Sequence, residues 1–227
     1  PQDINHPMKP RSPYGASKCA AHHLVKVYRE SYDIYAVHGI LFNHEGTKRG
    51  EEFVTRKITK GVARIYDEIF NVEKWRSRSR ERKTCGAYKP IELGNIYAKR
   101  DWSDSEDFVE GVWLMLNQDK PKDYVLSSGE THSIKEFVTK AFSVANIKGK
   151  WVEIDGKPEE AKFTHSCLDK HDDLVVINPD FYRPAEVELL LGDSTPIREE
   201  IGWKPKSSFD DLVKKMVKHD MLNYNYE

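Results

Sequence analysis

Apolar and polar positions alternate along the chain with periods that predict both helices and strands. Residues 12–31 show the 3.6-residue spacing of an amphipathic helix. Residues 34–42 form a nearly continuous apolar, β-branched run, which is typical of a strand buried on both faces of a parallel sheet. A polar loop bounded by glycine, residues 43–50, follows this strand. Because open α/β sheets bind ligands at the carboxyl ends of their strands, the loop is a candidate binding element.

The rest of the pattern predicts helices and strands in a mixed order. Helices are expected over residues 53–66, 104–117, 133–145 and 208–222, and strands over 91–95, 124–126, 151–154 and 174–177. In the first two helices the side chains expected to face the core are Ile58, Val62, Ile65, Phe108, Val109, Val112, Trp113 and Leu116. Ser133 and Glu136 form a capping box that opens the third. The predicted fold class is therefore α/β.

Composition excludes several classes of function. The chain has 36 basic and 37 acidic residues and a net charge of -1, so no global field favours nucleic acid or a membrane surface. No apolar run approaches the length of a membrane span. Cys19, Cys85 and Cys167 are too far apart for a disulfide framework or a zinc cluster, and a reducing, cytoplasmic setting is expected. His22 and His23 lack partners at metal-ligand spacing, so no metal site is expected.

The most informative chemistry lies in Tyr14 and Lys18, four residues apart at the start of the first helix. Ser12 is a good N-cap and Pro13 suits the first helical position. An i,i+4 pair shares one helix face, and a nearby cation stabilises the phenolate form of tyrosine. Tyr14 is therefore a candidate proton-transfer group. The same spacing also arises by chance, where it means a half-buried tyrosine beside a solvated lysine.

Residues 76–83 form a dense basic run within a segment, residues 67–90, that matches no single element. Such a run can bind phosphate, but it more often forms a solvated loop. No aromatic residues are interleaved with the basic ones, and no signature of an RNA-binding fold accompanies them. We therefore favour a surface loop.

Longer motifs give the chain a family resemblance. Residues 11–18 resemble the active-site helix of extended short-chain dehydrogenase/reductases. More narrowly, the chain resembles the GDP-mannose 4,6-dehydratase family at residues 39–45, 49–50, 53–58, 93–95, 98–102, 182–187, 192–193 and 202–205. The likeness covers nearly all of residues 10–220, but only the C-terminal part of a family member.

This resemblance implies the C-terminal part of an NADP-binding Rossmann domain with a smaller mixed α/β substrate domain. Residues 1–50 would supply the last helix and strand of the Rossmann domain. Residues 51–227 would form mainly the substrate domain, with about 103–128 packing back on the Rossmann sheet. The family's glycine-rich turn and its catalytic threonine and glutamate would precede residue 1. We therefore expect a missing N-terminal segment, a fragment that is inactive alone, and a homodimer or homotetramer.

The resemblance also implies an activity. In this family, bound NADP+ takes hydride from C4 of GDP-mannose, water leaves across C5 and C6, and the hydride returns at C6. The product is GDP-4-keto-6-deoxymannose, with no net consumption of cofactor. Tyr14 would take the C4 hydroxyl proton, and Lys18 would bind the nicotinamide ribose and keep Tyr14 acidic. His44 and Arg49 would be further cofactor contacts.

The substrate contacts that the resemblance implies are Asn43, Val54, Lys57, Arg100, Arg183 and Glu186. Lys57 and Arg100 would lie at the diphosphate, and Glu186 could accept from the ring N–H and exocyclic amine of guanine. Considered without the resemblance, His44 could be a hydrogen-bonded loop histidine. Arg100 could form a surface ion pair with a neighbouring aspartate. Glu186 could be a first-turn glutamate that interacts with a helix dipole.

Two other functions stay open. The first is a GDP-sugar epimerase or reductase of the same family. Residues 43–45 and 183–186 together argue against it. The second is a non-catalytic interaction module that uses the basic run for a partner or an acidic polymer. Binding of GDP against UDP would separate guanine-reading from uracil-reading enzymes, and the upstream reading frame would separate an enzyme from a module.

Overall fold

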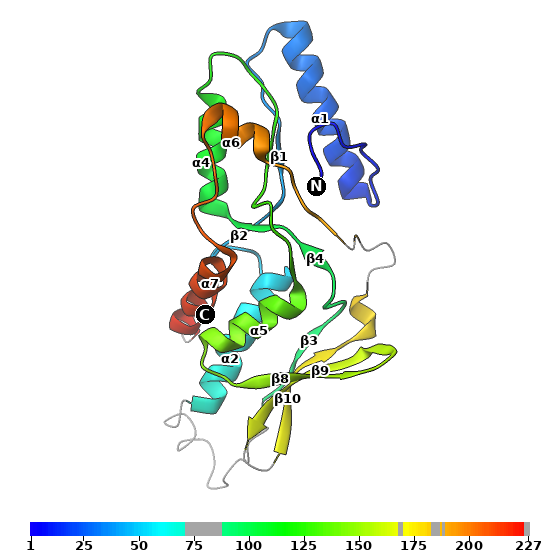
Figure 1. The fold of residues 1–227 in the computed structure, drawn as a ribbon, viewed down its shortest axis with the longest axis vertical. Helices are drawn as coiled ribbons and strands as arrows, with labels where there is room; N and C mark the ends of the chain where they lie inside the picture. Colours follow the sequence, from blue (N-terminus) through cyan, green and yellow to red (C-terminus); the bar gives the residue numbers. More distant parts are fainter. Residues whose placement is uncertain (71–87, 168–169, 183–186, 188, 225–227) are drawn as a thin grey trace. The chain divides into compact units, whose positions relative to one another are not determined.

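The computed structural model describes residues 1–70, 88–167, 170–182, 187 and 189–224 (Figure 1). The chain divides into two compact units, each assembled from three stretches of sequence. Unit 1 comprises residues 1–45, 99–132 and 183–209, and unit 2 comprises residues 46–98, 133–182 and 210–227. The short strand β7 (His132–Ser133) lies where the chain passes from one unit to the other.

Unit 1 contains helices around two parallel strand pairs. Its elements are α1 (Pro13–Tyr32), β1 (Gly39–Leu41), β2 (Asn43–Glu45), β4 (Lys99–Arg100), β5 (Trp102–Asp104), α4 (Ser105–Leu116), β6 (Tyr124–Leu126) and α6 (Thr195–Ile201). β1 pairs in parallel with β6, and β2 pairs in parallel with β5. In Figure 1, α1 and α4 lie on either side of β1. Parallel pairs flanked by helices confirm the α/β fold class.

The strand predicted over residues 34–42 is shorter and more exposed than expected. Only Gly39–Leu41 forms β1, and none of its residues is buried. The preceding backbone is held by side chains instead of a strand ladder. Asp123 accepts a hydrogen bond from the His38 amide at 2.8 Å, and Arg29 donates to the Ala36 carbonyl at 3.0 Å. The predicted loop that follows is also partly wrong, because Asn43–Glu45 forms β2.

The helix expected over residues 104–117 is confirmed as α4, with Asp104 as its N-cap, but three of its five predicted core residues are exposed. Phe108 and Met115 are buried, whereas Val109, Trp113 and Leu116 are exposed. The buried face packs in a cluster that contains Leu126 of β6 and Trp203. A Cβ on Gly111 would come within 2.5 Å of Leu126 and 2.9 Å of Trp203, so this glycine permits the close approach.

Unit 2 is built on a four-stranded sheet. Its elements are α2 (Val54–Phe70), β3 (Ile91–Leu93), α5 (Ile134–Val144), β8 (Gly149–Ile154), β9 (Lys157–Cys167), β10 (Lys170–Ile177), the 3-10 turn η1 (Pro179–Phe181) and α7 (Phe209–Asn223). The strand order is β3-β10-β9-β8, with β3 parallel to β10 and the other pairs antiparallel. Figure 1 shows α2 and α5 together on one side of this sheet.

The helices of unit 2 follow the sequence prediction closely. Ile58, Val62 and Ile65 of α2 are completely buried, as expected. The capping box of Ser133 and Glu136 forms at the start of α5, with both reciprocal hydrogen bonds present. β9 was not predicted, because its first residues, Lys-Pro-Glu-Glu, lack apolar alternation. Among the described residues, no helix is long and apolar enough to cross a bilayer.

One buried carboxylate connects separate segments of unit 1. Asp101 is fully buried, and its Oδ1 accepts from the Ser128 amide at 2.8 Å and the Ser128 hydroxyl at 2.6 Å. Its Oδ2 accepts from the amides of Gly129 and Gly192 at 3.1 and 3.2 Å. A buried ionised group is stable only when such donors replace water. Asp101 therefore fixes the loop after β6 and the backbone near residue 192.

We predict that Asp101→Asn lowers the free energy of unfolding by about 2 kcal/mol. The amide nitrogen would face two N–H donors where a carboxylate oxygen now accepts from both. Urea denaturation followed by tryptophan fluorescence would measure the change. Asp119→Asn, at an exposed position, is the control and should stay within about 0.5 kcal/mol of the parent. Equal stability of both variants would show that the four hydrogen bonds of Asp101 do not hold unit 1.

Candidate active site

The first turn of α1 presents Tyr14 and Lys18 together. Ser12 is the N-cap, as predicted, and its hydroxyl accepts from the Gly15 amide at 3.0 Å. Pro13 occupies the first turn. The ammonium nitrogen of Lys18 lies 5.4 Å from the centroid of the Tyr14 ring, and Tyr14 is 72% exposed. The two side chains therefore share one face of a fixed helix start, where a ligand can reach both.

His44, on β2, has a defined tautomer. Its Nδ1 lies 3.0 Å from the carbonyl oxygen of Phe42, and its ring packs 5.3 Å from that of Phe108. Because a carbonyl only accepts, Nδ1 carries the proton, and in the neutral ring Nε2 is an acceptor. Asn43 precedes it on β2, opposite Trp102 of β5. Trp102 is buried and stacks on Phe209.

Arg100, on β4, holds backbone in unit 1. Its Nη1 donates to the carbonyl of Val187 at 2.5 Å and to that of Lys99 at 2.9 Å. The Leu190 amide donates to the Lys99 carbonyl at 3.3 Å, so Val187 and Leu190 both lie beside β4. Arg183 and Glu186 precede this segment directly in the sequence. Both lie outside the described residues, as does the basic run at 76–83.

In unit 2, Arg49 lies in the turn before α2. Its amide donates to the Gly46 carbonyl at 3.1 Å, and its guanidinium carbon lies 3.5 Å from the centroid of the Phe53 ring. A guanidinium stacked on an aromatic face keeps its N–H groups directed outward in the plane of the fork. Arg49 is thus oriented by its own turn and by Phe53.

Lys57 lies in the first turn of α2, which begins at Val54. Its ammonium nitrogen is 4.0 Å from the centroid of the Phe181 ring. Burial lowers the pKa of Lys57, although the nearby Glu92 carboxylate opposes that change. Among the expected ligand residues, unit 2 thus contains Arg49, Val54 and Lys57, and unit 1 contains Tyr14, Lys18, Asn43, His44 and Arg100.

Arg56, which lies between these cations in the sequence, was not expected to belong to the site. It is buried, and its guanidinium pairs with Asp220 of α7. Two features of the sequence could have marked its members singly, although neither indicates that they pair. Arg56 is spaced three residues from Thr59 and seven from Ala63 on the buried face of α2. Asp220 is an acidic residue near the C-terminus of a helix, where the helix dipole disfavours it.

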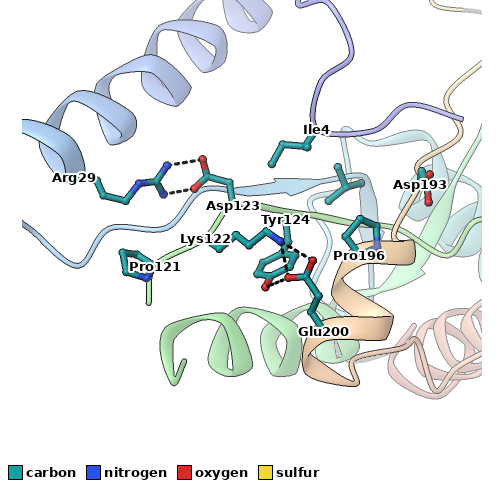
Figure 2. A pocket seen from close by; sticks show the side chains of 10 residues that line it. Ile4, Arg29, Pro121, Lys122, Asp123, Tyr124, Asp193, Pro196 and Glu200 are labelled. Carbon is teal, nitrogen blue, oxygen red and sulfur yellow. Dashed lines mark hydrogen bonds and ion pairs between the residues drawn. The ribbon is translucent and has the colours of Figure 1, made fainter. Parts of the chain in front are cut away.

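Several charged side chains line a cavity of about 380 Å³ in unit 1. The ion pairs drawn there each join two residues of the cavity lining (Figure 2). Arg29 forms a bidentate pair with Asp123, and Lys122 pairs with Glu200. Burial, assisted by a hydrogen bond to Glu200, raises the pKa of Tyr124 to about 12. Arg29 is 15 residues along α1 from Tyr14, about 22 Å at the rise of an α-helix. This cavity is therefore separate from the tyrosine–lysine pair.

Solved structures resemble the fold. RMD from Pseudomonas aeruginosa, complexed with NADPH, aligns with a TM-score of 0.71 at 18% identity, over 98% of this chain and 60% of that one. The UDP-glucose 4-epimerase of Thermus thermophilus, complexed with NAD, aligns with a TM-score of 0.69 at 20% identity, over 96% and 57%. At these identities the likeness establishes the fold alone.

Sequence comparison is more specific. The family model described as GDP-mannose 4,6 dehydratase matches residues 1–216. The GDP-mannose 4,6 dehydratase of Dictyostelium discoideum is 44% identical over 97% of this chain and 56% of its own length. The Homo sapiens protein of that name is 42% identical over 97% of this chain and 53% of its own length. The chain therefore spans about half the length of these curated relatives. The chain belongs to the GDP-mannose 4,6-dehydratase family.

Proposed function

We propose that this protein is a GDP-mannose 4,6-dehydratase, which converts GDP-mannose to GDP-4-keto-6-deoxymannose and water with NADP+ recycled at each turnover. The observation that carries the proposal is the exposed Tyr14–Lys18 pair on the capped first turn of α1, in a chain that the family model spans from residue 1 to residue 216. The two relatives described above are named for the same reaction, and the sequence motifs agree with it.

The side chains fit the chemistry of a dinucleotide. Tyr14 and Lys18 present a hydroxyl and an ammonium, which suit ribose hydroxyl groups, and His44 offers Nε2. Arg49 offers a guanidinium fork, which suits a phosphate. We assign all four to NADP. When bound, NADP+ supplies the acceptor and later the donor of the hydride.

The proton chemistry belongs to this chain. Tyr14 takes the proton of the C4 hydroxyl as that carbon becomes a carbonyl, and Lys18 binds the nicotinamide ribose beside it. The N-cap of Ser12 and the ring of Pro13 fix the backbone of this turn, so both side chains keep their relation to one another. We assign removal of the C5 proton to the catalytic glutamate that family members carry in their N-terminal half. Turnover is therefore to be measured on the product of the whole open reading frame.

We assign the sugar nucleotide to Asn43, Val54, Lys57, Arg100, Arg183 and Glu186. Lys57 lies at the start of α2, where the helix N-terminus favours an anion such as a diphosphate. Arg100 lies on β4, where its Nη1 donates to the carbonyls of Val187 and Lys99, and a guanidinium suits a diphosphate. In this proposal unit 1 belongs to the dinucleotide domain and unit 2 forms most of the substrate domain.

We also propose that the protein associates as a homodimer or homotetramer. The family resemblance supports this. Leu24, Val27, Tyr28 and Tyr32 of α1 are between 51% and 66% exposed in this chain, which spans about half of its relatives' length.

Tyr14→Phe should abolish most of the turnover while it leaves nucleotide binding intact. Removal of a positioned acid–base group lowers the rate by about 10²–10⁴-fold. The assay follows the 4-keto product from GDP-mannose, and isothermal titration gives the GDP affinity. Tyr66→Phe, on α2 and outside the residues assigned to cofactor and substrate, is the matched control. Unchanged turnover in Tyr14→Phe, or no 4-keto product from the parent protein, would refute the proposed reaction.

The affinity for GDP should fall with rising pH as Lys57 loses its proton. Because burial lowers the pKa of Lys57, the loss begins at a lower pH than for a solvated lysine. Lys57→Arg stays charged over this range, so the ratio of its affinity to that of the parent should increase as the pH rises. Titration of both proteins from neutral pH upward tests this, and their ratio cancels the ionisation of the nucleotide. Parallel curves would show that Lys57 does not contact the diphosphate.

Selection of the base distinguishes this function from that of a uracil-reading relative. GDP should bind about 10²-fold more tightly than UDP, because a carboxylate left without its guanine donors is penalised. Glu186→Gln should reduce this preference, whereas Glu199→Gln, at an exposed position of α6, should not. Isothermal titration with both nucleotides gives the ratio. Equal affinities would favour another sugar-nucleotide specificity, and no binding of either would favour an interaction module.

A further inference from the structure

The loop that carries Arg49 is held by a buried arginine of the following helix. Nη1 of Arg56 donates to the Thr47 carbonyl at 2.5 Å and to the Arg49 carbonyl at 3.0 Å. Only 6% of Arg56 is exposed. One guanidinium nitrogen therefore binds two carbonyls of the same loop and ties that loop to α2.

The charge of Arg56 is balanced from the last helix of the chain. Nε donates to Oδ2 of Asp220 at 3.0 Å, and Nη2 lies 2.9 Å from Oδ1, so the pair is bidentate. The Thr59 hydroxyl donates to Oδ2 at 2.6 Å. The side chains of Arg56 and Asp220 are 7% and 2% exposed. All of these residues lie in unit 2.

Stability alone does not account for this arrangement. A buried ion pair loses so much solvation that apolar residues of similar volume often serve as well or better. A guanidinium offers what an apolar side chain lacks, namely N–H donors in a rigid planar fork. Here Nε and Nη2 are bound by Asp220, and Nη1 is thereby directed at the loop carbonyls. The arrangement is suited to setting the position of a backbone.

We propose that Arg56, oriented by Asp220, is a positioning residue of the dinucleotide site, which acts by fixing the backbone from Thr47 to Arg49. The inference rests on the proposed function, in which Arg49 contacts NADP. The guanidinium of Arg49 stacks on Phe53 at 3.5 Å, so a displaced loop would move it off this ring. Helix α7 then contributes to the cofactor site through Asp220, which pairs with Arg56 and accepts a hydrogen bond from Thr59.

Hydrogen–deuterium exchange tests the fixing of the loop without any cofactor. In Arg56→Lys and Asp220→Asn, the amides of residues 46–53 should exchange about tenfold faster, as expected for loss of one hydrogen bond. Lys60→Gln is the matched control, because Lys60 also reaches from α2 to this segment, pairing with the exposed Glu51 at 2.5 Å. Exchange in that variant should equal the parent's. Thr59→Val removes one hydrogen bond to Asp220 and provides a milder variant if the others fail to fold.

NADPH affinity of the whole protein tests the effect on the site. Arg49→Ala and Arg56→Lys should each raise the dissociation constant, the latter by about tenfold, because small displacements of a binding group are costly. The double variant should bind as weakly as Arg49→Ala alone, since Arg56 acts through Arg49. Nucleotide fluorescence gives the constants, and thermal melts taken in parallel report stability.

Three outcomes would overturn the inference and leave the assignment of Arg49 to the cofactor in place. Loop exchange in Arg56→Lys could equal the parent's, or the effects of Arg49→Ala and Arg56→Lys on NADPH binding could add. In the third, Arg56→Lys lowers the melting temperature while NADPH affinity stays unchanged, which would mark a structural role only. If Arg49→Ala itself leaves NADPH affinity unchanged, the assignment of Arg49 to the cofactor fails, and the inference fails with it. The two failures are thus distinguishable.

Discussion

Buried ionised side chains must replace every lost water with a fixed hydrogen-bond partner, and this constraint organises both units. Asp101 accepts from the backbone at residues 128, 129 and 192, and Arg56 donates to the backbone at 47 and 49. The strands of unit 1 are only two or three residues long, so their ladders fix little of the loops between them. Charged groups that bind backbone therefore connect stretches of sequence that strand pairing leaves unconnected.

Features encoded by neighbouring residues were predictable. Ser12 and Pro13 determine where α1 begins, and Ser133 with Glu136 determines where α5 begins, because a cap involves residues within one turn. The apolar run at 34–42 led to the prediction of too long a strand, because its backbone is held by the side chains of Arg29 and Asp123. Asp123 is 85 residues away from His38, so the local pattern does not contain this contact. The apolar periodicity of α4 likewise predicts an apolar stripe, but it does not determine which residues of that stripe pack against Trp203.

Some features of the candidate site were likewise predictable from local sequence, and others were not. The proximity of Tyr14 and Lys18 follows from helical spacing alone, and the Lys18 ammonium lies 5.4 Å from the centroid of the Tyr14 ring. The Arg56–Asp220 pair joins residues 164 apart, and no local pattern contains that information. For Arg100 the family resemblance predicts a contact with the diphosphate. It does not predict the hydrogen bonds that Arg100 donates to the Val187 and Lys99 carbonyls. A guanidinium has enough donors for both roles.

Exposure and rigidity are usually opposed, and the proposed chemistry needs both at Tyr14. A proton-transfer group must be reachable by its substrate, and Tyr14 is 72% exposed. The cap of Ser12 and the restricted ring of Pro13 fix the backbone of this turn through bonds within the turn itself. Local capping thus orients the reactive pair without covering it, while buried charge fixes the surrounding loops.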